Sequence, residues 1–364
     1  MAAHSFIWIG DEGFFAYRES YATEFAALFR DDELVADLDA PVYQLNAALL
    51  RDRLDVLGFT ASHAQERLDL LFAEVDDGGL ESFPDWLTTM HAALNGDGAV
   101  DEVPAWTVHG DIRLPLRLML DAAPDDMPVS LDLSDVVARG YVSATPDLCA
   151  RAFSEHHGAA AYAPLIVLTE GRSDAAILML GIDVLSPHLR GYIRFLDYER
   201  KPEGSTSALV RVVRAFAAAG VSNRVLALFD NDTAAAEALT TLGVDALPPN
   251  YRVVQLPHLQ LAEQYPTLGP TGPVVMDING LAVSIELFFG ADILRGSGPD
   301  LTPVQWTGWS AKIGRYQGEI LHKSSLQEAF RERARRTLAS GGPDEADDWS
   351  GMRLVIDTLR TSFA

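Results

Sequence analysis

Between residues 165 and 256, short runs of β-forming residues alternate with segments of helical pattern, and this alternation constrains the fold more than any other feature. Apolar residues spaced three and four positions apart identify helices, and short continuous apolar runs identify buried strands. The predicted elements, in chain order, are 165–168, 173–185, 192–196, 205–219, 225–229, 233–242 and 251–256. Strands and helices that alternate in this way form a mostly parallel sheet flanked by helices, an α/β fold.

Acidic residues follow two of the predicted strands. Glu170 comes just after the first strand, and Asp230 and Asp232 come just after the third. A further acidic residue, Glu286, lies beyond the predicted sheet. Ligands of open α/β sheets bind beyond the carboxyl ends of the strands, so we expect these side chains to meet there. Gathered carboxylates repel one another unless a divalent cation neutralises them, and hard oxygen ligands suit Mg²⁺ or Mn²⁺.

Asp230 and Asp232 are the best candidates for metal ligands. Side chains two residues apart in an extended segment lie on the same face, so both can reach one cation. The structural alternative is that Asp232 caps the helix predicted at 233–242, because Asp is common at this position.

The segment after the first strand adds two candidates. Gly171 permits a tight turn and the close approach of a phosphate or metal. Asp174, four residues beyond Glu170, is expected to project back toward it from the first helical turn. The alternatives are a solvated loop carboxylate for Glu170 and stabilisation of the helix dipole for Asp174.

These residues together resemble the Toprim domain over about residues 163–258. Members of that family place a Glu after one strand and a DxD after a later strand, and both bind Mg²⁺ in topoisomerases, primases and certain nucleases. The added Asp174 is similar to the pattern of overcoming-lysogenisation-defect nucleases, and Arg172 stands where many members have Lys.

Further segments look like bacterial HEPN/Toprim-associated proteins, and together they touch most of the chain. They are 9–11, 53–59, 279–286, 303–308 and 316–323. By similarity to the nuclease branch, Glu286 would be a further metal or supporting carboxylate, and Lys323 would stabilise negative charge in the transition state. Gly171 and Arg172 would bind phosphate. The resemblance implies a role in bacterial defence against phage.

The sequence predicts four segments. Residues 1–75 form an N-terminal α+β domain, and 76–160 a mixed α/β connector that is either separate or continuous with it. Residues 161–262 form the Toprim-like core, and 263–364 a C-terminal helical extension that completes the site. Outside the core we expect a hairpin at 5–18, helices at 43–57, 60–72, 85–94, 281–289 and 324–338, short strands at 106–108 and 112–114, and a stiff loop at 265–273.

Charge and composition narrow the functional classes. The net charge of −24 opposes unaided binding of nucleic acid, so bound metal ions or a protein partner would have to offset it. Cys149 is the only cysteine, which excludes the zinc cysteines of bacterial primases. No apolar run reaches the roughly 20 residues of a membrane span, and the N-terminus does not resemble a signal peptide. We therefore expect a cytoplasmic protein without membrane contact.

The resulting hypothesis is a nuclease that cuts DNA or RNA with two Mg²⁺ or Mn²⁺ ions held by Glu170, Asp174, Asp230 and Asp232. The alternative is a non-catalytic sensor or assembly subunit that binds metal, nucleotide, a protein partner or a second copy of itself. Aromatic residues expected at the surface favour that alternative: Phe14, Phe15, Trp306 and Trp309.

One further motif is set aside. Arg151 and His156 fit the Arg-x4-6-His spacing of HEPN ribonucleases. The segment abuts the first predicted strand of the core instead of ending a helical bundle. We interpret His156 and His157 as a surface or interface pair.

Overall fold

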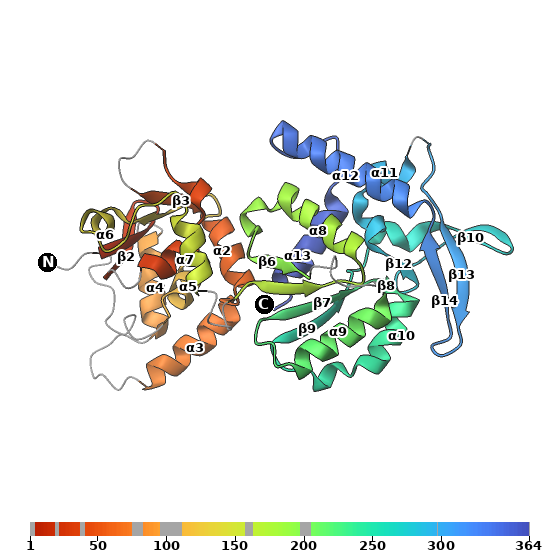
Figure 1. Cartoon of the computed structure of the whole chain (residues 1–364), viewed down its shortest axis with the longest axis horizontal. Helices are drawn as coiled ribbons and strands as arrows, with labels where there is room; N and C mark the ends of the chain where they lie inside the picture. The colour runs from red at the N-terminus through yellow and green to blue at the C-terminus, as the bar shows by residue number, and fades with distance from the viewer. Residues whose placement is uncertain are drawn as a thin grey trace. The chain divides into compact units, whose positions relative to one another are not determined.

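The computed structural model of the chain describes residues 4–18, 22–36, 41–74, 83–94, 111–156, 163–196, 205–296 and 298–363. The chain divides into two compact units, residues 1–163 with the last two residues, and residues 164–362. Both mix helices and strands (Figure 1). The division falls close to the predicted start of the core at 161, and the finer predicted boundaries stay predictions.

The first unit contains a four-stranded antiparallel sheet in the order β2-β1-β4-β3. Its strands are β1 (His4–Ile9), β2 (Glu12–Arg18), β3 (Val42–Asn46) and β4 (Pro128–Asp132). Its helices are α1 (Ala22–Ala26), α2 (Ala47–Val56), α3 (Ala61–Glu74), α4 (Phe83–Leu94), α5 (Arg113–Leu120), α6 (Ser134–Ala138) and α7 (Leu148–His156). Alternate residues of β1, Ile7 and Ile9, are buried, as expected for a sheet with one face in the core.

Two local predictions in this unit are wrong. The helix predicted at 43–57 begins only at Ala47, because the residues before it form β3 and pair with β4. The strand predicted at 112–114 is instead the start of α5, with Ile112 as the N-cap and the helix beginning at Arg113. Pro115 is tolerated there because it lies in the first helical turn, where its missing N–H has no partner to lose. The hairpin at 5–18 and the helices α3 and α4 are confirmed, and 106–108 lies outside the described residues.

The second unit contains the predicted parallel sheet, in the order β6-β5-β7-β9. All four strands and the three helices between them are confirmed: β5 (Leu165–Leu168), α8 (Arg172–Leu185), β6 (Ile193–Phe195), α9 (Thr206–Ala218), β7 (Val225–Phe229), α10 (Thr233–Leu242) and β9 (Tyr251–Gln255). Helices α9 and α10 cover one face, and α8 lies on the other with α12 (Lys323–Ser340) and α13 (Ser350–Thr361) (Figure 1). Burial of Val225, Ala227 and Phe229 against α9 and α10 fixes the position of β7.

The strand order places a topological switch point at the carboxyl ends of β5 and β7. The chain passes from β5 to β6 on one side, and then crosses to form β7 on the other side of β5. The connections that leave the carboxyl ends of β5 and β7 therefore run in opposite directions. In open α/β sheets this switch point is where ligands bind.

A second sheet of mixed direction follows, in the order β11-β10-β13-β14. It is built from β10 (Tyr265–Gly269), β11 (Gly272–Met276), β13 (Val304–Ser310) and β14 (Arg315–Ile320). The loop predicted at 265–273 is thus wrong, since these residues form most of the β10–β11 hairpin. Pro273 is accommodated because β11 lies at the sheet edge, and Pro266 precedes the two residues that pair with β13.

The helix predicted at 281–289 is also wrong. Ala282 and Val283 form β12, which pairs antiparallel with β8 (Asn231–Asp232). The short 3-10 helix η9 (Ile285–Phe289) follows, and α11 (Ala291–Arg295) comes after it. Strand pairing therefore holds Ala282 and Val283 beside the DxD segment. The helix predicted at 324–338 is confirmed as α12.

Among the residues that the structure describes, none of the helices combines the length and apolar character that a membrane crossing requires.

Candidate functional site

The turn after β5 places Glu170 at the switch point. Its Oε1 accepts a hydrogen bond from the backbone N–H of Asp230 at 3.1 Å, directly joining the ends of β5 and β7. Its Oε2 accepts from the hydroxyl of Thr206, the first residue of α9, at 2.5 Å. Glu170 is therefore held between two strand ends and a helix, and it is not the solvated loop carboxylate of the alternative interpretation.

Asp232 is fixed by two partners. Its Oδ1 accepts from the N–H of Ala235 at 2.7 Å and so caps α10, as the structural alternative expected. Its Oδ2 accepts from Nε2 of Gln317 on β14 at 3.0 Å. The cap uses one oxygen only, so a structural role and a position beside Asp230 coexist.

Asp230 differs from the other acids of the site. It is half-buried at the end of β7, and its backbone is tied by its N–H to Glu170 and by its C=O to Gln255. Within the described residues its carboxylate accepts no hydrogen bond and forms no ion pair. A carboxylate removed from water without a partner is costly, so it marks a position reserved for a ligand or a proton.

Two more acids close the site from α8 and η9. Asp174 Oδ2 accepts from the N–H of Gly171 at 3.0 Å, and the Ser173 hydroxyl donates to Oδ1 at 3.2 Å. Glu286 is only 3% exposed. It accepts from the Ser284 hydroxyl at 2.6 Å and from Nε2 of Gln327 on α12 at 2.8 Å.

Burial and mutual repulsion raise the pKa values of three carboxyls. Burial raises the pKa of Asp174 to about 7, and the charges of Glu286 and Glu170 add to the effect. Burial, followed by Glu170, Asp174, Asp232 and Glu286, raises the pKa of Asp230 well above its ordinary value. Burial also raises the pKa of Glu170, against the opposing effect of its hydrogen bonds. These acids are thus close enough to repel one another strongly, which is the convergence that the sequence predicts.

Lys323, the first residue of α12, brings a positive charge to the same place. Burial alone would lower its pKa, but Glu286 and Asp230 raise it above the ordinary value. Its Nζ lies 3.7 Å from a carboxylate oxygen of Glu319. The ammonium therefore stays charged throughout the neutral range and offsets part of the acidic charge.

The donor set matches the preference of a hard divalent cation, because all of its donors are carboxylate oxygens. Burial and the neighbouring acids raise the pKa values of three of them, and a bound cation would offset part of this cost. In the described part of the chain, however, no group of three or more His, Cys, Asp or Glu is already arranged as a metal site. The reason lies in the contacts among the described residues: four of the five acids accept hydrogen bonds from them, and the carboxylate of Asp230 accepts none. The residues fit Mg²⁺ or Mn²⁺ in chemistry, and binding requires some of them to exchange a protein donor for the ion.

The two predicted phosphate-binding residues lie at the start of α8. Gly171 is its N-cap with extended backbone (φ −149°), which any residue can adopt, so the conformation at this position does not require glycine. Its N–H points to Asp174. Arg172 is exposed at the first position of the helix.

Sequence reasoning missed four residues that complete the site. Thr206, Gln317 and Gln327 donate to the acids, and Arg315 lies beside the DxD segment. A guanidinium nitrogen of Arg315 lies 3.7 Å from where a Cβ on Gly280 would stand, next to the Asn231 side chain. Only the helix start at Ser205–Thr206 had a recognisable local signal, because the other three arrive through tertiary folding.

The remaining candidates lie apart from these contacts. Arg151 on α7 forms an exposed ion pair with Asp147 at 3.6 Å, and the side chain of His156 lies outside the described residues. Trp309 is 56% exposed and Trp306 half-buried. The side chains of Phe14 and Phe15 are also outside the described set.

Comparisons with models of protein families, with curated proteins and with solved structures found no match to this chain.

Proposed function

We propose that the chain is a Toprim-like nuclease that hydrolyses phosphodiester bonds of DNA or RNA with Mg²⁺ or Mn²⁺, and that it serves bacterial defence against phage. The observation that carries the proposal is the unengaged carboxylate of Asp230 at the switch point. It is surrounded by four further acids and one lysine. An arrangement of this kind favours a ligand that carries concentrated positive charge.

Glu170, Asp174, Asp230 and Asp232 would hold the ions, with Glu286 bordering them. Two divalent ions, when bound, supply positive charge to the scissile phosphate and lower the pKa of the attacking water.

Lys323 serves as a fixed cation toward the phosphate oxygens, because its ammonium stays charged in this acidic setting. The hydrogen bond from Thr206 opposes the rise that burial causes in the pKa of Glu170, and Gln317 holds Asp232 in place. Arg172 and Arg315 would contact phosphates of the same strand.

The test is a digestion panel with plasmid, single-stranded DNA and tRNA, each in Mg²⁺, Mn²⁺ or a chelator. The intact chain should cut at least one substrate with a divalent ion and none with the chelator. Asp230→Ala should reduce cleavage on the order of 10⁴-fold without changing the circular dichroism spectrum. Asp245→Ala, which alters an exposed acid after α10, should cut normally. Full cleavage by Asp230→Ala in Mn²⁺ would overturn the assignment.

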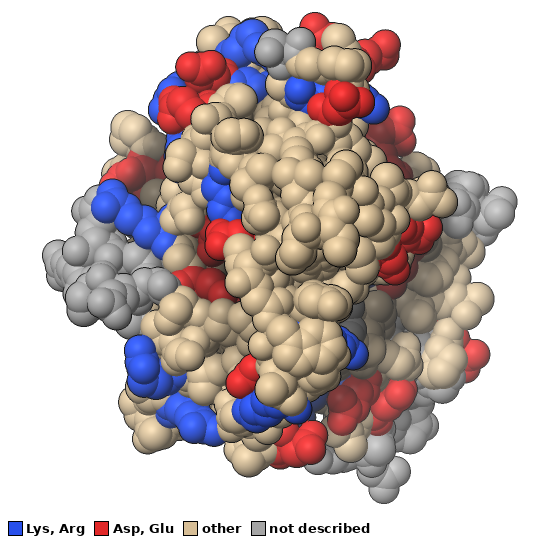
Figure 2. Space-filling view, turned by 90° about the vertical axis from the view of Figure 1, so that its right-hand side faces the viewer, with Lys and Arg blue, Asp and Glu red and all other residues tan. Residues whose placement is uncertain are grey.

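A second candidate function is supported by an uncharged surface over the second sheet. Figure 2 shows this surface framed by acidic and basic residues. Trp309 and Tyr316 pack edge to face there, 4.8 Å apart, and both are more than half exposed. Exposed aromatic surface of this kind is typical of a protein interface, and it favours an assembly subunit. The test is the mass in solution of the intact chain and of Trp309→Ser. If both have the mass of a single chain, self-association through this surface is contradicted.

A further inference from the structure

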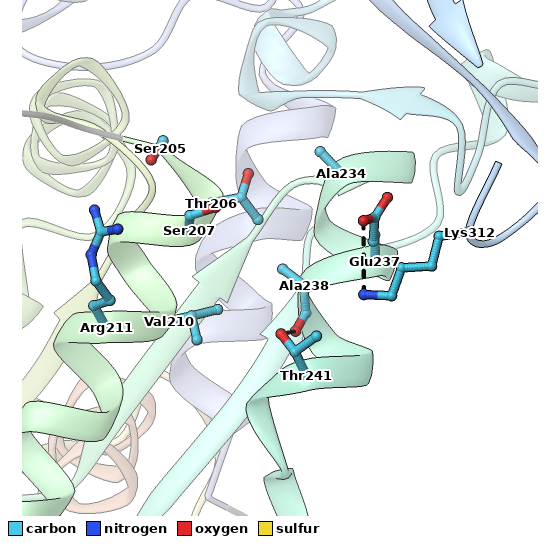
Figure 3. Close-up of a pocket in the computed structure, with 10 residues that line it drawn as sticks. All are labelled: Ser205, Thr206, Ser207, Val210, Arg211, Ala234, Glu237, Ala238, Thr241 and Lys312. Atoms are coloured by element: carbon cyan, nitrogen blue, oxygen red, sulfur yellow. Dashed lines mark hydrogen bonds and ion pairs between the residues drawn. The ribbon is translucent and has the colours of Figure 1, made fainter. Parts of the chain in front are cut away.

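A cavity of about 560 Å³ opens between α9 and α10 (Figure 3). Its volume lies in the range of small-ligand sites. The hydroxyl side chains Ser205, Thr206 and Ser207 line one end, where α9 begins. Ala234 and Ala238 of α10 form the opposite wall, and the turn between β13 and β14 brings Lys312 over it.

One residue joins this cavity to the acidic centre. Thr206 lines the cavity, and its hydroxyl donates to Glu170 at 2.5 Å. The cavity therefore begins one side chain away from the carboxylates at the switch point. A chain-like ligand held in the cavity would be led directly to the proposed site of cleavage.

The charge of the lining selects the ligand. Arg211 is exposed on α9 and forms no ion pair with any carboxylate in the described ranges. Lys312 Nζ lies 3.7 Å from Glu237 Oε1, the acid of the lining, while Glu237 Oε2 accepts from the Ser310 hydroxyl at 2.6 Å. Two cations and four hydroxyl side chains against one acid favour an anion, in a protein whose net charge is −24.

The residue types of the lining indicate which class of anion fits the cavity. The described residues around the cavity include no aromatic side chain on which a base could stack. Arginine with hydroxyl groups recognises phosphate, because guanidinium and O–H donors match its oxygens. The lining therefore suits the backbone of a nucleic acid and gives little grip on its bases.

We propose that this cavity binds a backbone phosphate of the nucleic-acid strand, next to the phosphate that is cleaved, through Arg211 and Lys312. The inference rests on the proposed function and adds a strand-holding site to it. Because the contacts are to phosphate, the site binds all sequences alike.

The kinetic test uses Arg211→Gln/Lys312→Gln and two substrates. One is a 12-nucleotide single strand, as DNA and as RNA, and the other is bis(p-nitrophenyl) phosphate, which is too short to span both sites. The double variant should raise KM for the 12-mer about tenfold with kcat nearly unchanged, and hydrolyse the small diester at the normal rate. Glu237→Gln, which releases Lys312 from its ion pair, should lower KM two- to threefold.

The matched control is Arg335→Gln/Arg336→Gln, which removes the same charge from exposed positions of α12. It should change KM for the 12-mer less than twofold. An equal effect of both double variants would show that only total charge matters, and would overturn the site. So would equal losses on both substrates.

Direct binding separates this inference from the proposed function. The Asp230→Asn protein, made to block cleavage, is compared with the same protein that also carries Arg211→Gln/Lys312→Gln. The anisotropy of a fluorescent 12-mer gives the binding constant K of each at several salt concentrations. Loss of this one phosphate contact should reduce the slope of log K against log salt by about 0.7. An unchanged slope contradicts the phosphate site even if the intact chain cuts nucleic acid. A reduced slope, together with no cleavage by the intact chain in the digestion panel, supports the phosphate site and contradicts the nuclease.

A competition arm distinguishes a strand from a free nucleotide. AMP at millimolar concentration should displace the 12-mer only weakly. If AMP binds more tightly than the 12-mer, and the double variant abolishes AMP binding alone, the cavity holds a free nucleotide and the proposal fails.

Discussion

The buried carboxylates of the two units have opposite surroundings. In the first unit, Arg53 is fully buried and donates to both oxygens of Glu33. Arg117 there donates to Asp55 at 2.7 Å. In the second unit, Asp230 has no such partner among the described residues, and burial together with the neighbouring acids raises its pKa. Arginine therefore balances the carboxylate charge in the first unit, whereas the carboxylate charge at Asp230 in the second unit is unbalanced.

The second unit thus gives up stability at the acidic centre in favour of binding. A buried ion pair that is complete is nearly neutral for stability, but breaking it leaves a costly charge. The acidic centre resembles an ion pair whose cationic partner is missing from the protein and would be supplied by a cation from solution. Changes that complete or break pairs should consequently have opposite signs in the two units.

The largest effect is expected at Arg53. Arg53→Ala leaves Glu33 without its partner and should lower the free energy of unfolding by about 3–5 kcal/mol, measured by urea denaturation. Arg151→Ala breaks an exposed pair in the same unit and should cost no more than about 1 kcal/mol. Similar losses for both variants would remove the distinction between paired and unpaired acids.

Divalent ions should stabilise the second unit through its acids. At a concentration one hundred times the dissociation constant, Mn²⁺ should raise the free energy of unfolding by about 2.7 kcal/mol, seen as a higher melting temperature. Asp230→Ala should lose this gain, and Arg151→Ala should keep it. Equal stabilisation by NaCl of matched ionic strength would show that only screening is involved.

Asp174 should make the free energy of unfolding fall with rising pH, the opposite of the effect of a carboxyl whose pKa is lowered on folding. Its pKa is raised to about 7 from an ordinary 3.8, so the native state holds this proton where the unfolded chain has released it. In a chelator, the free energy of unfolding should thus fall as pH rises from about 4 to 7, by up to about 1.4 kcal/mol per pH unit for one proton. Asp174→Asn should flatten the slope, and an unchanged slope would place the effect elsewhere.

The smallest effect is expected at Thr206. Thr206→Val removes the hydroxyl that keeps the pKa of Glu170 from rising further. The acidic limb of the profile of kcat/KM against pH should move to higher pH, with about a threefold loss at neutral pH, or ~0.7 kcal/mol. Thr206→Ser keeps the hydroxyl and should keep the profile. A uniform loss at every pH would mean that Thr206 acts only in packing.

The core of the second unit could be predicted from sequence because its signals are local. Leu165–Leu168 and Val225–Phe229 are continuous apolar runs that fold into strands buried on both faces. The meeting of Glu170 with Asp230 follows from the positions of these strand ends, once the strands are neighbours. Their hydrogen bond bears out the expected convergence.

The rest depended on contacts between distant parts of the chain. Gln317 reaches Asp232 across 85 positions, so no pattern near either residue signals the contact. The apolar run at 281–289 suits a helix by composition, but pairing with β8 makes its first residues a strand. The hairpin β13–β14 brings Arg315 to the DxD segment and Lys312 to the cavity, and no local pattern at its turn signals either position.

The two bonds of Asp232 couple events at separate places. One oxygen holds α10, while the other tethers β14, and with it the turn that carries Lys312. The Thr233 hydroxyl also donates to the backbone C=O of Tyr316 on β14, so an ion that draws the second oxygen of Asp232 away would loosen the hairpin without releasing it. Metal binding at the acidic centre and the position of Lys312 would then be linked through Gln317.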